Sequence, residues 1–346
     1  MPQLPAEIIL HVLECLIPPA APVALSPRDP VTQTLMSFTL ASRLTHQAAK
    51  RLLFKHCIYL DSDRRLDHVL SQLNAGDGER QPEPVGLFLA PFPYCNLEEP
   101  CVIKRVDQLL SHIGGNLRRL VIDIPLRSLH PDEDEQRLRK ILRAAFVRLT
   151  RLEEFCSVRD ELYLDTKETD DESEPPVWSF WPHLKRLALY NVSVEEPGFL
   201  QALRQCSNLT HLFLTRPDCL WEPIDPALKG ITWWSSLQRI VIVNTAKDYE
   251  LELQRCGPGW KTSFLGQITC FEDTDAAESN TPTLKAMPSL DYISVKVPPD
   301  LEDDMIDTCQ EWVCQHAVAG TLWDISGASF TREHREVELP VDEHSS

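Results

Sequence analysis

Hydrophobic residues near the start of the chain recur at helical spacing. Within residues 4–16 they fall three or four positions apart and share one face, at Ile8, Ile9, Val12, Leu13 and Leu16. Pro18 and Pro19 end this helix, because proline has no N–H to donate and clashes with the preceding turn. A loop rich in proline and alanine follows over residues 18–30. The opening of the chain therefore predicts a short amphipathic helix followed by a loop.

A second, longer helix is predicted from Val31 to Phe54. It carries two apolar stripes, one with Leu35, Phe38 and Ser42, the other with Met36, Leu40, Leu44 and Ala48. A helix that is apolar on more than one side must bury two faces. We expect one stripe to face inward and the other to contact a different surface.

A strand-like signature recurs along the rest of the chain. Each copy begins with a leucine, and apolar residues follow three and five positions later. The copies begin at Leu117, Leu152, Leu184, Leu209, Leu237 and Leu290, which lie 25 to 53 residues apart. Ser157 departs from the rule, because it occupies a position where the other copies have an apolar residue. Two earlier strands are predicted at residues 58–60 and 85–89.

Helical patterns separate these strands, over residues 102–113, 132–149 and 197–205. One strand with one helix cannot bury its own apolar face, whereas stacked units form a continuous core and a parallel sheet. We therefore predict an α/β solenoid with parallel strands and outer helices over residues 55–325. An amphipathic helix at 301–317 is expected to close its C-terminal end. Their composition predicts polar loops at 165–176 and 272–283 and a disordered tail at 331–346.

Alternation along the strands identifies a candidate binding face. The residues on either side of the second apolar position are expected on the exposed side of the sheet. One such row reads Arg119, Glu154, Arg186, His211, Arg239 and Tyr292, and the next contains Phe213. Arginine and aromatic side chains contribute strongly to interfaces. We expect Arg119, Arg186, His211, Phe213 and Arg239 to bind a protein substrate with an acidic or phosphorylated element. Alternatively, loops or the C-terminal segment cover this face, or the arginines pair with local carboxylates.

Charge and composition limit the classes of partner and the cellular compartment that we expect. The net charge is −18, which repels phosphates, so neither nucleic acid nor a membrane surface is an expected partner. The chain has 43% hydrophobic residues, no run long enough for a membrane helix and no signal-peptide pattern at its start. Its 11 cysteines include no CxxC pair and lie mostly in apolar runs, which favours reduced core thiols. We expect a cytoplasmic or nuclear protein with no metal and no cofactor.

The sequence contains no recognisable catalytic motif. Nucleotide-binding glycine motifs, the nucleophile-elbow pattern and the zinc-protease HExxH motif do not occur. Cys309 and His316 are seven residues apart and could share a helix face, but core packing explains them equally well. We therefore expect a non-catalytic protein with no catalytic residues.

The N-terminal residues resemble a motif of a known protein family. Leu4-Pro5-x-Glu7-Ile8-Ile9-x-x-Val12-Leu13-x-x-Leu16, with Thr34-Leu35, Ala41-Ser42-Arg43, Ala48 and Leu53-Phe54 further on, resembles the F-box of fungal proteins with irregular leucine-rich repeats. The resemblance implies an F-box-like helical module over residues 1–54. It also implies a Skp-family adaptor and, through it, a cullin as partners. Carried over to this sequence, the adaptor-facing residues are Leu4, Pro5, Ile8, Val12, Leu16, Leu35 and Phe38.

Together these features predict the substrate-recognition subunit of a Skp–cullin–F-box ubiquitin ligase. Such a subunit acts by proximity, because one end holds the ligase and the other holds the protein substrate. Two alternatives remain open. In the first, the N-terminal helices are only a cap for the solenoid. In the second, the whole chain is a leucine-rich-repeat scaffold that binds a protein partner without a role in ubiquitylation.

Overall fold

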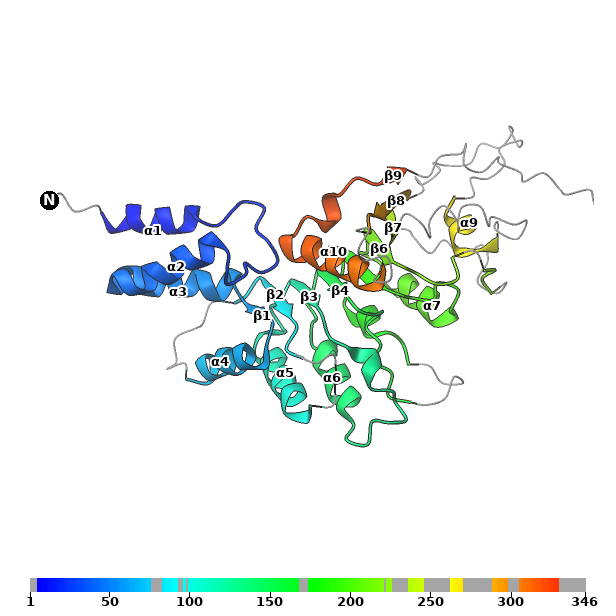
Figure 1. Ribbon diagram of the computed structural model, residues 1–346, viewed down its shortest axis with the longest axis horizontal. Coiled ribbons are helices and arrows are strands. Elements are labelled where there is room, and N and C mark those ends of the chain that lie inside the picture. The colour runs from blue at the N-terminus through cyan, green and yellow to red at the C-terminus, as the bar shows by residue number, and fades with distance from the viewer. Residues whose placement is uncertain are drawn as a thin grey trace, which may run out of the picture.

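The computed structural model of the chain describes residues 5–75, 83–92, 96–97, 99–167, 174–220, 222–225, 236–245, 262–269, 288–297 and 305–329. It is an α/β fold in which a parallel sheet runs through the molecule and an N-terminal group of helices lies at one end (Figure 1). The predicted loop at 272–283, the predicted tail at 331–346 and half of the predicted acidic loop at 165–176 lie outside these residues.

The sheet is built from strands that stand side by side in the order of the sequence. Strands β1 to β8 are parallel, and a short β9 pairs antiparallel with β8. Their bounds are β1 Tyr59–Leu60, β2 Gly86–Leu89, β3 Arg119–Ile122, β4 Glu154–Ser157, β5 Arg186–Tyr190, β6 His211–Thr215, β7 Arg239–Thr245, β8 Ser289–Val295 and β9 Ala328–Ser329. Sequential parallel pairing with helical crossovers confirms the predicted solenoid-like α/β arrangement.

Helices connect successive strands on one side of the sheet (Figure 1). They are α4 Asp63–Asn74, α5 Pro100–Ile113, α6 Leu138–Val147, the 3-10 turn η3 Val177–Phe180 and α7 Pro197–Gln205, with the shorter η1 Leu126–Ser128 and α9 Phe264–Thr269. The predicted helix at 132–149 begins only at Leu138. The carboxylate of Asp134 accepts the N–H groups of Leu138 and Arg139 and so caps the helix, and Arg137 before it has a positive φ of 56°.

Both faces of the sheet are buried. Leu120 and Ile122 point to the side of the connecting helices, whereas Val121 points to the opposite side, and each side has its own hydrophobic core. Helix α10, Met305–Ala319, lies over the second face and contacts β3, β7 and β8, with Cys309 and Val313 fully buried against it. The face expected to be exposed is therefore covered, which is the alternative that the sequence left open for the C-terminal segment. The helix expected to close the C-terminal end covers the sheet instead.

Strand β8 pairs in a register that differs from the predicted one. The repeat spacing aligned Tyr292 with Arg239, but the structure aligns Arg239 with Ser289 and Ile240 with Leu290. This shift of three residues exchanges the two faces of the strand, because side chains alternate with a period of two. Tyr292 consequently belongs to the core under the connecting helices, while Asp291 faces the α10 side and pairs with Arg239.

Three helices form the N-terminal module: α1 Ala6–Cys15, α2 Pro30–Ala41 and α3 Arg43–His56. The predicted single helix over 31–54 is two helices, because Ser42 is extended at φ −160°. The Ser42 hydroxyl accepts the Thr45 N–H, and the Thr45 hydroxyl accepts the Ser42 N–H, which caps the new helix reciprocally. Helices α2 and α3 can therefore fold back on each other.

The loop between α1 and α2 joins the module to the sheet. It runs from α1 toward α10 and returns to α2 (Figure 1). Val23, Ala24 and Leu25 in this loop are buried, and the Val23 N–H donates to the Val318 carbonyl of α10 at 2.9 Å. Arg119 of β3 donates to the carbonyls of Ala21 and Pro22. The predicted proline-rich loop is thus a packed connection between the two parts of the chain.

Candidate functional site

Exposed apolar side chains gather on the N-terminal module. Ile8 and Val12 lie one turn apart on α1, and Met36 and Leu40 lie one turn apart on α2. With Leu44 of α3 these residues are exposed by 42% to 89% of their surface, and Leu40 is the most exposed. Among the described residues, only three other large apolar side chains are comparably exposed: Val147, Phe180 and Ile306. Concentration of apolar surface in this way is typical of a protein-binding surface.

The module buries its other apolar stripe in a small core of its own. Leu13, Leu35 and Ala49 are fully buried, and Leu16 and Phe38 pack around them. Of the residues expected on the adaptor-facing surface, Leu35 therefore belongs to the interior, and Phe38 is half-buried against it. The sequence predicted two stripes on this segment, and the structure leaves the one with Met36, Leu40 and Leu44 accessible.

The remaining residues of the predicted adaptor-facing set divide as follows. Ile8 and Val12 are exposed, as the prediction requires. Pro5 is exposed and precedes the first turn of α1. Leu16 is half-buried at the end of that helix. Leu4 lies outside the described residues. The exposed large apolar residues are consequently Ile8 and Val12 on α1, Met36 and Leu40 on α2 and Leu44 on α3, and we call these five residues the apolar surface of the module.

The residues expected to bind a substrate lie under the C-terminal segment. Arg239 donates to Asp291 at 2.6 Å and to the carbonyls of Trp323 and Ile325. Phe213 is 1% exposed and packs edge-on against Trp323, with ring centres 5.4 Å apart. These two residues fasten the segment after α10, including the turn η6 Leu322–Asp324, onto the sheet.

The other charged residues of this row are engaged as well. Arg186 donates to Glu154 at 2.9 Å, and its guanidinium lies 5.9 Å from the centre of the Trp323 ring. Arg119 holds the loop of the N-terminal module, as described above. Burial, together with the charges of Arg186 and Arg239 on either side, lowers the pKa of His211. The row joins parts of the fold to one another, which agrees with the alternative that the C-terminal segment covers this face and the arginines pair with local carboxylates.

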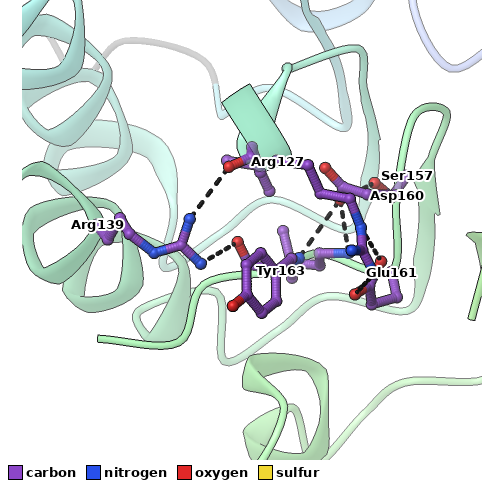
Figure 2. Close-up of polar contacts among 8 residues, drawn as sticks. Arg127, Arg139, Ser157, Asp160, Glu161 and Tyr163 are labelled. Carbon is purple, nitrogen blue, oxygen red and sulfur yellow. Dashed lines mark hydrogen bonds and ion pairs between the residues drawn. The ribbon is translucent and has the colours of Figure 1, made fainter. Parts of the chain in front are cut away.

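A buried arginine organises a second polar cluster, which the sequence did not indicate (Figure 2). Arg139 of α6 is fully buried and donates to the carbonyls of Leu126, Leu129, Tyr163 and Asp165. Its guanidinium also lies 4.3 Å from the centre of the Tyr163 ring. A buried charge is tolerated when it is hydrogen-bonded, and these four carbonyls accept from all three nitrogens of the guanidinium. Arg139 thus fixes two irregular segments that follow β3 and β4.

Asp160 lies beside this cluster and is also buried (Figure 2). Its Oδ1 atom accepts the Ser157 hydroxyl at 3.2 Å and the Leu162 N–H at 2.8 Å, which explains the buried serine that departs from the repeat pattern. Burial, and then the charge of Glu161, raises the pKa of Asp160 to about 7. Arg127 forms a double hydrogen bond with Glu161 at the edge of the cluster. Since Asp160 is 1% exposed, it cannot meet a substrate, and its role is structural.

Cysteine, histidine and carboxylate side chains are the remaining candidates for chemistry among the described residues. No group of three or more His, Cys, Asp or Glu side chains among them could hold a metal ion. Burial raises the pKa of Cys206 and Cys314 to about 12, which keeps both as unreactive thiols. Cys309 is buried against the sheet, whereas His316 bonds to the Thr321 hydroxyl, so the arrangement does not favour joint chemistry by this pair.

Comparison of the chain with protein-family models and with curated proteins finds no match. Over the described ranges, none of the helices is long and apolar enough to cross a membrane. The candidate site therefore rests on geometry alone, and the apolar surface of the module is its strongest feature.

Proposed function

We propose that the chain is the substrate-recognition subunit of a Skp–cullin–F-box ubiquitin ligase. The observation that carries this proposal is the apolar surface of the module, which stands on three helices at one end of the fold (Figure 1). Exposed apolar residues on a small helical unit suit docking onto a helical adaptor, because burial of each large side chain contributes about 1.5–3 kcal/mol. The resemblance of the opening helix to an F-box specifies which adaptor.

The mechanism is proximity rather than bond chemistry. The adaptor binds the module and brings the cullin with it, while the solenoid presents a protein substrate to the ligase. The C-terminal segment fills the face first expected to bind the substrate, so substrate contacts belong to other surfaces of the solenoid. The tight connection between module and sheet supports this division of labour, because it holds the two ends at a fixed separation.

A binding experiment with purified Skp-family adaptor tests the proposal. Wild-type chain is expected to bind, and Leu40→Asp is expected to weaken binding at least about tenfold, since a charge replaces a large contact residue. Leu40 is 89% exposed, so this change should leave the thermal melting curve unaltered. Ile306→Asp is the matched control, because Ile306 is exposed on α10, away from the module.

The outcome also separates the alternatives. If wild type does not bind the adaptor, the ligase proposal is wrong and the scaffold alternative takes its place. If wild type binds and both variants bind equally well, the adaptor uses a surface other than the apolar surface of the module.

A further inference from the structure

Charge is distributed unevenly between the two parts of the chain. Residues 1–57 contain five Lys and Arg against three Asp and Glu, a net charge of +2, although the whole chain carries −18. The rest of the protein therefore carries −20. Within the module the positive charge is concentrated on α3, which has Arg43, Lys50, Arg51 and Lys55 and no acidic residue.

Among the described residues, these four cations have no acidic partners. All four are exposed, and none takes part in an ion pair among the residues that the structure describes. In the solenoid, by contrast, many arginines form ion pairs with nearby carboxylates. Glu153, for example, pairs with both Arg118 and Lys185 at 2.7 Å. Unpaired cations gathered on one helix of an acidic protein indicate a surface that is completed by another molecule.

The cations adjoin the apolar surface of the module. Leu44, Arg51 and Lys55 are seven and four residues apart, so they follow one side of α3. Arg43 and Lys50 are also seven residues apart and form a neighbouring line. A partner that contacts Leu44 would therefore meet positive charge along the next turns of the same helix.

We propose that the outer face of α3, defined by Arg43, Lys50, Arg51 and Lys55, binds an acidic surface of the adaptor. This proposal rests on the proposed function and adds the chemistry of the partner surface. A protein partner is favoured over a polyanion, because the −20 charge of the remaining chain repels nucleic acid and anionic lipid. The contact with Leu44 also calls for apolar groups beside the carboxylates, which a protein surface supplies.

Exposed ion pairs act mainly through the rate of association. Each contributes modestly, and salt screens it, because the screening length falls from about 10 Å at 0.1 M to about 3 Å at 1 M. Complementary charge across an interface steers the encounter and raises the association rate constant at low salt. Loss of three such cations should therefore weaken binding roughly tenfold at low salt and much less at high salt.

The test compares two triple variants of the full chain. Lys50→Gln, Arg51→Gln and Lys55→Gln remove the charge from α3 and preserve helix propensity. The control carries Arg64→Gln, Lys104→Gln and Lys140→Gln, which remove the same charge from exposed positions on α4, α5 and α6. Binding of each to purified adaptor is measured at about 0.1 M and about 1 M salt.

We expect the α3 variant to lose about tenfold in affinity at low salt, mostly through slower association, while the control changes less than about twofold. Equal affinity and equal salt dependence of wild type and the α3 variant, with Leu40→Asp still defective, would overturn this inference and leave the proposed function intact. Failure of wild type to bind at either salt concentration would overturn both. Binding of heparin or anionic vesicles that only the α3 variant loses, without a change in adaptor binding, would assign the face to a polyanion and also refute the inference.

Discussion

The raised pKa of Asp160 makes the stability of the fold depend on pH in an unusual direction. The folded chain holds this carboxyl in its protonated form up to a pKa of about 7, whereas the ordinary value is 3.8. Between these two values the folded state binds a proton that the unfolded chain has released. The free energy of unfolding must then fall as pH rises through this window, and become constant above about pH 7. Glu153 acts in the opposite direction, because the hydrogen bond from Lys185 and the charges of Lys185 and Arg118 lower its pKa.

The magnitude follows from the size of the shift. Each unit of pKa corresponds to 1.36 kcal/mol, so a shift of about three units corresponds to about 4 kcal/mol in total. About 2–3 kcal/mol of this falls between pH 5 and pH 7. Asp160→Asn removes the titrating group but keeps an oxygen that can accept the Leu162 N–H. We therefore expect the variant to gain about 2–3 kcal/mol relative to wild type when both are moved from pH 5 to pH 8.

Urea unfolding of both proteins between pH 5 and pH 8 measures this difference. Comparing the two profiles cancels the titration of groups that they share, such as His56, whose pKa is lowered to about 4 mainly by burial. Glu153→Gln is the control, because a carboxyl with a lowered pKa stays ionised throughout this range. Parallel profiles for wild type and Asp160→Asn would refute the reasoning, because they would mean that Asp160 is ionised in the folded protein.

Two further changes probe how the covered sheet and the loop are held. Arg239→Ala should lower the free energy of unfolding by about 3 kcal/mol in urea titrations, because it removes the partly buried guanidinium that pairs with Asp291 and holds the carbonyls of Trp323 and Ile325. Arg118→Ala, whose side chain is 60% exposed, should cost less than about 1 kcal/mol. Gly86→Ala places a Cβ atom 2.0 Å from the Val23 carbonyl oxygen and should destabilise by about 2–3 kcal/mol in the same assay. Gly115→Ala meets nothing within 4 Å and should change stability by less than about 0.5 kcal/mol. Equal effects within either pair would contradict the contacts described.

The strands could be predicted from the sequence because each repeat fixes them locally. A leading leucine such as Leu184, with Leu187 and Leu189 after it, marks the side chains that the connecting helices bury, and all three are buried. The amphipathic helices α5 and α7 followed from the same reasoning. These features depend on residues close together in the chain, which is where periodicity carries information.

The covered face could have been recognised from composition. The positions between the helix-side residues are also apolar, as in the run Ile240-Val241-Ile242-Val243 of β7, and such runs are typical of parallel strands buried on both faces. The C-terminal segment was one of the covers that the sequence left open, but periodicity does not choose between it and the loops. Helix α10 reaches the sheet from far along the chain, and no local pattern encodes that contact. The same limit applies to Arg139, whose acceptors extend from Leu126 to Asp165.

Leu35, which was expected on the adaptor-facing surface but is buried, shows a limit of predicting exposure from apolar stripes on a helix. The segment over 31–54 has two apolar stripes, and helical spacing alone does not say which of them faces inward. The break at Ser42 decides it, because α3 folds back along α2 and covers Leu35 with Ala49. The capping pair of Ser42 with Thr45 was a signal in the sequence, although the more usual partner three residues on is Glu or Gln.

The connection between module and sheet shows how the long loop after α1 holds the two parts of the chain together, which the proposed function requires. An unattached loop of this length would let the module swing, because loop closure restricts its ends only weakly. Here the loop is hydrogen-bonded in turn to α10 through Val23, to α3 through the Leu25 N–H and to β3 through Arg119. All four hydrogen bonds use backbone groups of the loop, and the buried side chains of Val23, Ala24 and Leu25 add apolar packing to the attachment. The length of the loop therefore adds contacts rather than freedom, and it fixes the apolar surface of the module relative to the solenoid.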